Sequence, residues 1–306
     1  MPRGFGRVDE WICALTATST TLSGRRVPAQ TDLFGSDSSS RGAEPFLKWA
    51  GGKRQLLPEL RKRIPKSFGA YFEPFLGSGA LFFALSPKSS FLSDANCELI
   101  AAYTAIRDRP THVIKRLGHY RNTEADFNRV RSQEPNRLSL PERAARLIYL
   151  NRTCYNGLYR VNRKGQFNTP FGAYKNPTIC NERVLLGASR ALQGARLACA
   201  DYKEALAGAK SGDFVYLDPP YVPVSQYSDF RRYHTVPFGT EEHERLRDIV
   251  DELARRGCYV MLSNSYTPFT VSLYKQWNVH RVEAKRLINK NPDGRRLITE
   301  LLVTSY

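Results

Sequence analysis

The chain has 306 residues, of which 42% are hydrophobic and 25% charged, so it can bury a substantial core and lacks the composition of a disordered protein. Its 46 lysines and arginines outnumber 29 aspartates and glutamates, and the net charge of +17 indicates a polyanionic partner, nucleic acid first, although a solvated basic surface would carry the same charge. No apolar run approaches the length of a membrane span and the first residues show no secretory pattern, so we expect neither.

The six cysteines predict free thiols. They are Cys13, Cys97, Cys154, Cys180, Cys199 and Cys258. No two have CxxC spacing and no histidines gather near them, so we expect neither a zinc site nor a disulfide framework. Reduced thiols are typical of a cytoplasmic protein.

Residues 1–44 differ from the rest of the chain. Residues 36–42 are rich in serine, and the isolated apolar patch at 11–15 is too short to build a core. We expect a flexible extension here.

The next part of the chain alternates between strands and helices. Residues 71–75 predict a short strand that leads into a glycine turn at 77–79. A helix over 80–85 and a strand over 90–93 follow.

The middle of the chain is strongly basic. Between residues 106 and 196 there are 18 basic and 6 acidic side chains, so this segment carries 12 of the 17 surplus positive charges. A surplus concentrated in one segment favours a docking surface over a uniformly solvated one. We therefore predict a mainly helical insertion that binds nucleic acid.

The last third returns to the alternating pattern. An apolar stretch at 195–200 precedes a buried strand at 214–217, and a helix over 241–256 precedes a strand at 259–262. Residues 277–288 and 297–304 predict an antiparallel pair around a turn at 291–294. The whole pattern predicts an α/β fold with a doubly wound, Rossmann-like sheet interrupted by the insertion.

Asp218, Pro219, Pro220 and Tyr221 directly follow the buried strand 214–217, at the sheet edge where such folds bind ligands. The prolines remove two donors and leave carbonyls free to accept. An aspartate beside a free carbonyl can accept both hydrogens of an exocyclic amino group, and Tyr221 offers a ring for a planar base. The alternative is a strand ended by prolines, with aspartate as a turn former.

A second ligand-binding turn follows the strand at 71–75. Gly77 and Gly79 allow a ligand to approach the backbone closely. Asp94 ends the next strand, where it either binds ribose hydroxyls or caps the following helix. Residues 49–53 lack the first glycine and the final serine or threonine of a phosphate-binding loop, which counts against nucleotide triphosphates.

Several motifs together resemble the Dam-type DNA adenine methyltransferases. They are FLKWAGGK at 46–53, EPFLGSG at 73–79, Asp94, NGL at 156–158, PFG at 170–172 and DPPY at 218–221. The resemblance runs from residue 46 to the C-terminus and includes the order of cofactor motif, recognition segment and DPPY. It implies methyl transfer from S-adenosylmethionine to the amino group of adenine in double-stranded DNA, usually in GATC.

The resemblance also implies an organisation and a setting. Residues 45–105 and 197–306 would form the catalytic domain that binds S-adenosylmethionine, and residues 106–196 the target-recognition domain. The protein would be a cytoplasmic, nucleoid-associated monomer of bacterial or phage type that needs no metal.

Site residues follow from matching positions. The resemblance gives a cofactor role to Trp49, Lys53, Phe75, Gly77, Gly79, Asp94, Asp201 and Asp218. The catalytic set is Asp218, Pro219, Pro220 and Tyr221. The DNA-binding set is Lys48, Tyr155, Asn156, Leu158, Arg160, Pro170 and Tyr174. Tyr155 would wedge into the base stack. Arg160 can pair bidentately with guanine, while Arg163 and Lys164 are expected to contact phosphate.

Other functions fit less well. A cytosine-C5 methyltransferase needs a Pro-Cys nucleophile, and none of the six cysteines follows a proline. RNA and protein methyltransferases more often carry asparagine in place of Asp218. An adenine methyltransferase with another target sequence and a non-catalytic DNA-binding module remain as alternatives.

Overall fold

The computed structural model describes residues 42–223, 238–285 and 297–306, and residues 42–306 form one compact unit. Most of the extension expected at 1–44, and the turn expected at 291–294, therefore lie outside the described residues. Among the described residues, no helix is long and apolar enough to span a membrane.

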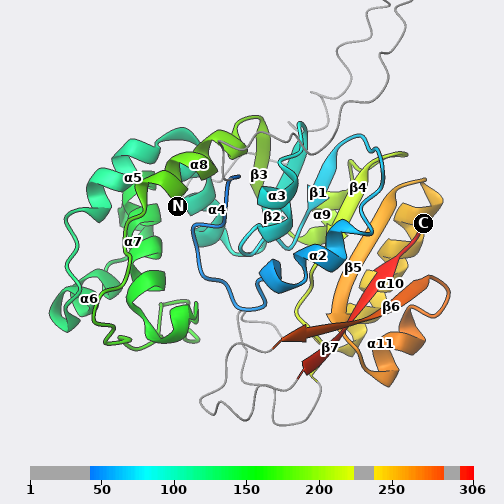
Figure 1. Ribbon diagram of the computed structural model, residues 1–306. Coiled ribbons are helices and arrows are strands. Elements are labelled where there is room, and N and C mark those ends of the chain that lie inside the picture. Colours follow the sequence, from blue (N-terminus) through cyan, green and yellow to red (C-terminus); the bar gives the residue numbers. More distant parts are fainter. Residues whose placement is uncertain (1–41, 224–237, 286–296) are drawn as a thin grey trace, which may run out of the picture. The chain divides into compact units, whose positions relative to one another are not determined.

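The described strands form one sheet with the order β3-β2-β1-β4-β5-β7-β6 (Figure 1). The strands are β1 (Tyr71–Glu73), β2 (Ser90–Asp94), β3 (Ala195–Cys199), β4 (Phe214–Leu217), β5 (Tyr259–Ser265), β6 (Asn278–Lys285) and β7 (Leu297–Thr304). The pairs from β3 to β5 are parallel, while β7 lies between β5 and β6 and pairs antiparallel with both. The predicted strands and the antiparallel C-terminal pair are thus confirmed.

Both faces of the sheet are covered, which explains why its central strand is a continuous apolar run. In β4, Phe214 and Tyr216 enter one hydrophobic cluster, and Val215 and Leu217 enter the other. The helices of the first cluster are α2 (Leu57–Arg61), α3 (Ala80–Leu85) and α4 (Cys97–Asp108), and those of the second are α9 (Tyr202–Leu206) and α10 (Thr240–Arg255). This arrangement confirms the predicted doubly wound α/β fold.

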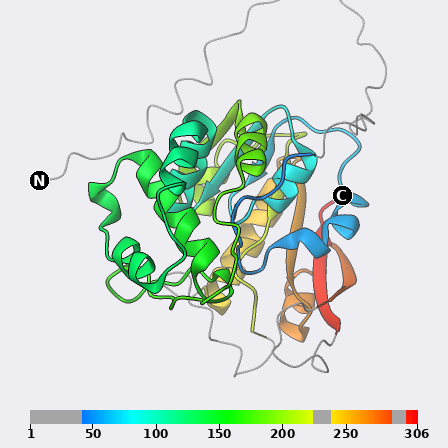
Figure 2. The ribbon, with the colours of Figure 1, turned by 60° about the vertical axis from the view of Figure 1, so that its left-hand side comes forward.

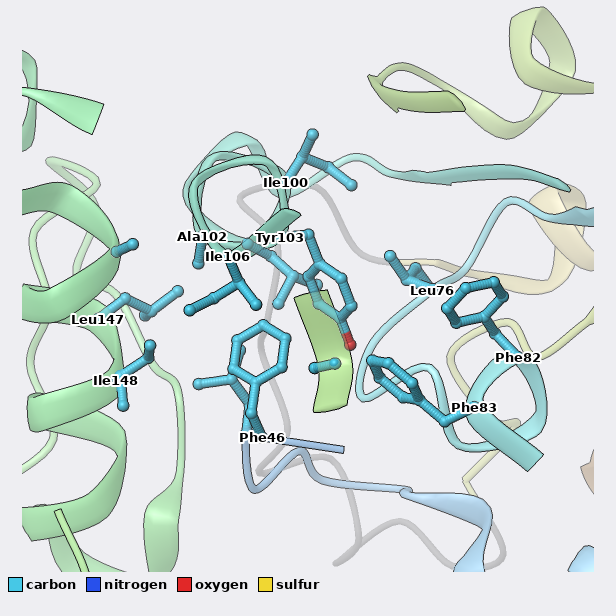
Figure 3. Packing of buried hydrophobic residues seen from close by; sticks show 14 of the residues in the cluster. Phe46, Leu76, Phe82, Phe83, Ile100, Ala102, Tyr103, Ile106, Leu147 and Ile148 are labelled. Atoms are coloured by element: carbon cyan, nitrogen blue, oxygen red, sulfur yellow. The ribbon is translucent and has the colours of Figure 1, made fainter. Parts of the chain in front are cut away.

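The basic middle segment is mainly helical. It contains α5 (Pro110–Leu117), α6 (Glu124–Arg131), α7 (Leu140–Thr153) and α8 (Glu182–Leu192). These helices lie beyond the β3 side of the sheet, away from β6 and β7 (Figures 1 and 2). Leu147 and Ile148 of α7 share a core with Tyr103 of α4 and with Phe46, as Figure 3 shows. The segment therefore packs on the same hydrophobic cluster as the sheet.

The prediction of free thiols is wrong for one pair. Cys97, the first residue of α4, and Cys199, the last residue of β3, form a disulfide with Cα atoms 5.0 Å apart. The cause is the sheet order, because β2 pairs with β3 and Asp94 stands opposite Cys199 in the register. Local sequence spacing cannot reveal this contact, since 102 positions separate the two cysteines.

Candidate active site

The candidate site lies where the strand order reverses, at the carboxyl ends of β1 and β4. β1 and β4 are neighbours in the sheet. From this pair, β2 and β3 continue the sheet in one direction, and β5 continues it in the other. The loops that leave β1 and β4 meet the segment 49–53 around a small polar pocket. It is lined by Trp49, Ala50, Gly51, Gly52, Lys53, Glu73, Leu76, Gly77, Ser78, Ala80, Leu81, Tyr216 and Asp218. Open α/β sheets bind ligands at such switch points.

A buried ion pair occupies the floor of this pocket. Lys53 Nζ lies 2.7 Å from Asp218 Oδ1, and the lysine is 6% exposed. The same ammonium donates to the carbonyl of Gly51 at 2.6 Å. Burial raises the pKa of Asp218, and the charge of Lys53 acts against that rise. Lys53 is one of the residues predicted to bind the cofactor, and its ammonium pairs with Asp218, which belongs to both the predicted cofactor set and the predicted catalytic set.

Tyr221 is fixed on two sides. Lys53 Nζ lies 4.5 Å from the centre of its ring, within the range of a cation–π contact. Its hydroxyl donates to Glu300 Oε2 at 2.7 Å. One more strand, β5, holds the loop: Ser263 Oγ donates to Asp218 Oδ1 at 2.9 Å, and the backbone N–H of Val222 donates to Asn264 Oδ1 at 3.1 Å.

Sequence reasoning missed these supporting residues. Ser263 and Asn264 carried a usable signal, because they follow a buried apolar run at the same sheet edge as Asp218. Glu300 carried none, because it lies inside the antiparallel strand β7 and reaches the site only through the sheet order.

The glycine turn after β1 approaches its neighbours closely. Gly77 has φ +47°, and a Cβ there would stand 2.9 Å from Trp49 Cδ1. Asp94 accepts the N–H of Gly77 at 3.0 Å with Oδ2 and the N–H of Asn96 at 2.9 Å with Oδ1. Asn96, rather than Asp94, caps α4 by accepting from Glu98 and Leu99. The helix-cap alternative for Asp94 is therefore wrong, and its carboxylate holds the glycine turn.

An aromatic cluster begins at Phe75, two residues before the glycine of the turn. Phe75 stacks on Tyr202 at 5.3 Å between ring centres and meets Phe238 edge-on at 6.0 Å. Asp201 accepts the N–H of Lys203 at 2.9 Å and so caps α9. Asp201 stands two residues beyond the end of β3, at the same sheet edge as Asp94. The turn and this aromatic cluster therefore flank the two acidic positions predicted to hold the ribose and the base of a nucleoside.

The predicted DNA-binding residues lie in three connected segments, at residue 48, at 155–160 and at 170–174. Asn151, which is 1% exposed, bonds the backbone of Lys48 in both directions and also donates to the carbonyl of Gly157. The Tyr174 hydroxyl accepts the N–H of Asn156 at 2.8 Å, and Lys48 Nζ lies 5.4 Å from the Tyr174 ring centre. A buried amide thus fixes residue 48 beside the turn 155–157.

Two further hydrogen bonds hold residues 155–158 and 169–170 of this surface together. The Tyr155 N–H donates to the Pro170 carbonyl at 2.9 Å, and Thr169 Oγ1 donates to the Leu158 carbonyl at 2.8 Å. The Tyr155 side chain is 41% exposed, which is rare for so large an apolar group in this structure. An exposed aromatic on a rigid turn suits insertion between stacked bases.

Arg160 belongs to the same surface, and its backbone carbonyl accepts the N–H of Asn168 at 2.8 Å. Its guanidinium donates to the side-chain oxygen of Asn168 at 2.9 Å through Nε and to the carbonyl of Asn168 at 3.0 Å through Nη2. Arg160 is exposed. Its guanidinium has five N–H donors, and those that do not bind Asn168 point elsewhere. The next residue, Tyr159, stacks on Trp49 at 5.3 Å, which links this surface to the pocket.

Within the described part of the chain, no group of three or more His, Cys, Asp or Glu side chains could hold a metal ion.

Comparisons with known proteins agree with this geometry. The family model of D12 class N6 adenine-specific DNA methyltransferases matches residues 49–288. The chain is 42% identical to the Type II methyltransferase M1.LlaDCHI of Lactococcus lactis subsp. cremoris, over 86% of this chain and 95% of the relative. It is 37% identical to the Type II methyltransferase M.MjaIII of Methanocaldococcus jannaschii, over 86% and 99%. It is 35% identical to the DNA adenine methylase of Escherichia coli K12, over 84% and 93%.

Proposed function

We propose that this chain, which belongs to the D12 class of N6 adenine-specific DNA methyltransferases, methylates a flipped adenine in double-stranded DNA, within GATC, with S-adenosylmethionine as methyl donor. The observation that carries the proposal is Asp218 at the end of β4, which pairs with Lys53 and lines one small pocket together with the glycine turn. The expected setting is the bacterial or phage nucleoid in the cytoplasm, with a monomeric enzyme.

The residues at the sheet edge fit the donor. Gly77 leaves no room for a Cβ beside Trp49, so the turn presents its bare backbone to a ligand. Asp94 and Asp201 stand at the ends of adjacent strands, in reach of ribose hydroxyls and an adenine amino group, and Phe75 adds a stacked ring. When bound, S-adenosylmethionine supplies an electrophilic methyl on a sulfonium, so this chain contributes positioning.

Asp218 orients the amino group of the target base. Its carboxylate and the carbonyl of Pro219 accept the two amino hydrogens, so that the nitrogen lone pair, otherwise delocalised into the ring, is directed toward the electrophilic methyl. Tyr221 stacks on the base, while Glu300 and Lys53 hold its ring in place. The proposal uses the ionised form of Asp218 as the acceptor. Burial raises the pKa of this carboxyl, and the charge of Lys53 opposes that rise.

DNA docks on the basic segment. Electrostatic contacts to phosphate give affinity that falls with salt, and base contacts give sequence choice. Tyr155 fills the space left by the flipped adenine, while Asn156, Leu158, Pro170, Tyr174 and Lys48 contact the flanking bases.

A substitution at Asp218 tests the catalytic assignment. Asp218→Ala is expected to abolish methyl transfer while S-adenosylmethionine binding, measured by calorimetry, stays within a few fold of the parent. Asp248→Ala, an exposed aspartate of α10 that pairs with Arg247, is the matched control. Full activity of Asp218→Ala would refute the assignment, and absence of cofactor binding by the parent would favour a non-catalytic DNA-binding module.

Target sequence is tested in cells and in vitro. Expression in a methylation-deficient host, followed by digestion with enzymes that distinguish methylated from unmethylated GATC, should give protected DNA. Cleavage at GATC with methylated adenine elsewhere would favour another target sequence. Arg160→Ala should reduce discrimination at one guanine by about 1–3 kcal/mol. An unchanged ratio of cognate to non-cognate rates would leave Arg160 with a phosphate contact only.

A further inference from the structure

One oxygen of the Asp218 carboxylate is held by two donors. Lys53 Nζ lies 2.7 Å and Ser263 Oγ 2.9 Å from Oδ1. Among the described residues, no hydrogen bond reaches Oδ2. Ser263 is fully buried in β5, the strand that pairs with β4, so its hydroxyl cannot exchange this bond for one to bulk water.

The single hydrogen of the Ser263 hydroxyl determines which atom is the donor in each of its contacts. A serine hydroxyl carries one hydrogen, and here it points to Asp218. Ser263 Oγ also lies 3.0 Å from the Tyr216 hydroxyl, so the tyrosine must be the donor in that second contact. Burial raises the pKa of Tyr216 well above its usual range, which keeps the phenol protonated and able to donate. The result is a one-way chain from Tyr216 to Ser263 to Asp218.

Two paired strands carry this chain of hydroxyls. Tyr216 and Ser263 are neutral, buried and carried by adjacent strands, whereas Lys53 reaches Asp218 from the segment before α2. A donor on a strand fixes the rotation of the carboxyl group, and the ammonium, with its three rotatable donors, supplies charge without fixing that rotation. The neighbouring Asn264 accepts the N–H of Val222, so β5 also holds the far end of the DPPY loop.

We propose that Ser263, oriented by Tyr216, is a positioning residue for methyl transfer: it engages Asp218 Oδ1 so that Oδ2 is the oxygen presented to the amino group of the target adenine. This inference rests on the proposed function, because it assigns Oδ2 the role of amino-group acceptor. Loss of the serine hydroxyl would let the carboxyl group rotate. It would also remove a donor that favours the ionised form of Asp218.

Ser263→Ala and Tyr216→Phe test the proposal in the full-length enzyme. The assays are single-turnover methylation of a GATC duplex across pH, calorimetry with S-adenosylmethionine, and thermal unfolding. For Ser263→Ala we expect the single-turnover rate at pH 7 to fall about 10- to 100-fold, which is the worth of a hydrogen bond to a charged group. We expect the acid limb of the pH profile to move up by about one unit. The cofactor dissociation constant should stay within twofold.

Two further variants separate positioning from packing. Ser263→Thr keeps the hydroxyl and should recover part of the rate and the parent pH profile. Tyr216→Phe removes only the tyrosine hydroxyl. It should lower the rate and raise the acid limb of the pH profile, as Ser263→Ala does, but by smaller amounts. This variant tests the role of Ser263 if Ser263→Ala does not fold. Ser272→Ala, exposed on α11 (Pro268–Leu273), is the matched control.

The outcomes distinguish this inference from the proposed function. Rates within twofold of the parent for both Ser263→Ala and Tyr216→Phe, or a slower rate with an unmoved pH profile, would overturn the role of Ser263. An active Asp218→Ala enzyme would overturn the proposed function itself, and the inference with it.

Discussion

Glu73 is the buried carboxyl whose protonation should govern how stability varies with pH. It ends β1, is 3% exposed, and accepts the Tyr71 hydroxyl at 2.9 Å. Burial raises its pKa from 4.5 to about 8, and the nearby Asp218 and Asp94 act in the same direction. Glu73 is therefore neutral at pH 7, in a pocket where the proposed function uses the ionised form of Asp218. Two like charges so close and so little hydrated would oppose each other.

The sign of the effect follows from proton binding. Because the folded-state pKa lies above the unfolded value, the native state holds a proton that the unfolded chain releases. The stabilisation from Glu73 is complete below pH 4.5 and is lost as pH rises toward 8. With the folded pKa at about 8, the free energy of unfolding should fall by roughly 3–4 kcal/mol between pH 5 and pH 8 on account of this group alone.

Glu73→Gln isolates this contribution. Glutamine keeps the shape and the acceptor for Tyr71 but cannot ionise. In urea unfolding at pH 5, 6.5 and 8, the free energy of unfolding of the variant should therefore rise relative to that of the parent as pH rises. Glu283→Gln, an exposed residue of β6, is the matched control. A difference between Glu73→Gln and the parent that stays constant within about 0.5 kcal/mol across this range would refute the reasoning.

Three further predictions address other parts of the chain. Gly77→Ala should weaken S-adenosylmethionine binding about tenfold by calorimetry, because its Cβ would press on Trp49 in a left-handed backbone conformation; an unchanged affinity would count against the turn as part of the cofactor site. Burial lowers the pKa of His243 to about 4, below its unfolded value, so the free energy of unfolding falls as pH drops below 6.5. His243→Leu should remove that loss in urea unfolding; parallel plots of the free energy of unfolding against pH for variant and parent would contradict this. A thiol reductant should lower the free energy of unfolding by as much as about 4.7 kcal/mol through the bridge of Cys97 and Cys199; equal stability with and without reductant would contradict it.

The fold was predictable where the signal is local. Short apolar runs end in an aspartate twice, in Asp94 as the last residue of β2 and in Asp218 directly after β4. Parallel strands buried on both faces require such runs, and their carboxyl ends meet at one edge. The DPPY motif and the glycine turn could therefore be placed in one site before any coordinates were known.

Contacts that depend on strand order could not be predicted in the same way. Nothing near residue 300 indicates that β7 enters the sheet between β5 and β6, and only that insertion brings Glu300 to the Tyr221 hydroxyl. The pairing of β2 with β3 likewise brings Cys97 to Cys199. The cap of α4 is a closer miss: Asp94 and Asn96 are both good capping residues, and the choice depends on the tertiary demand of the Gly77 N–H for an acceptor.

Salt screens the charges of the surface more than those of the pocket. The affinity for DNA and the chemistry at Asp218 therefore depend on different groups. The surplus of +17 is carried mostly by the exposed, helical middle segment, where salt screens each charge. In the pocket, burial raises the pKa of Glu73, Asp218 and Glu300, while Lys53 lies 2.7 Å from Asp218. Screening barely reaches such buried pairs. Ionic strength therefore acts on how DNA arrives, whereas the pKa of Asp218 is raised by burial and lowered by the lysine and serine that hold it.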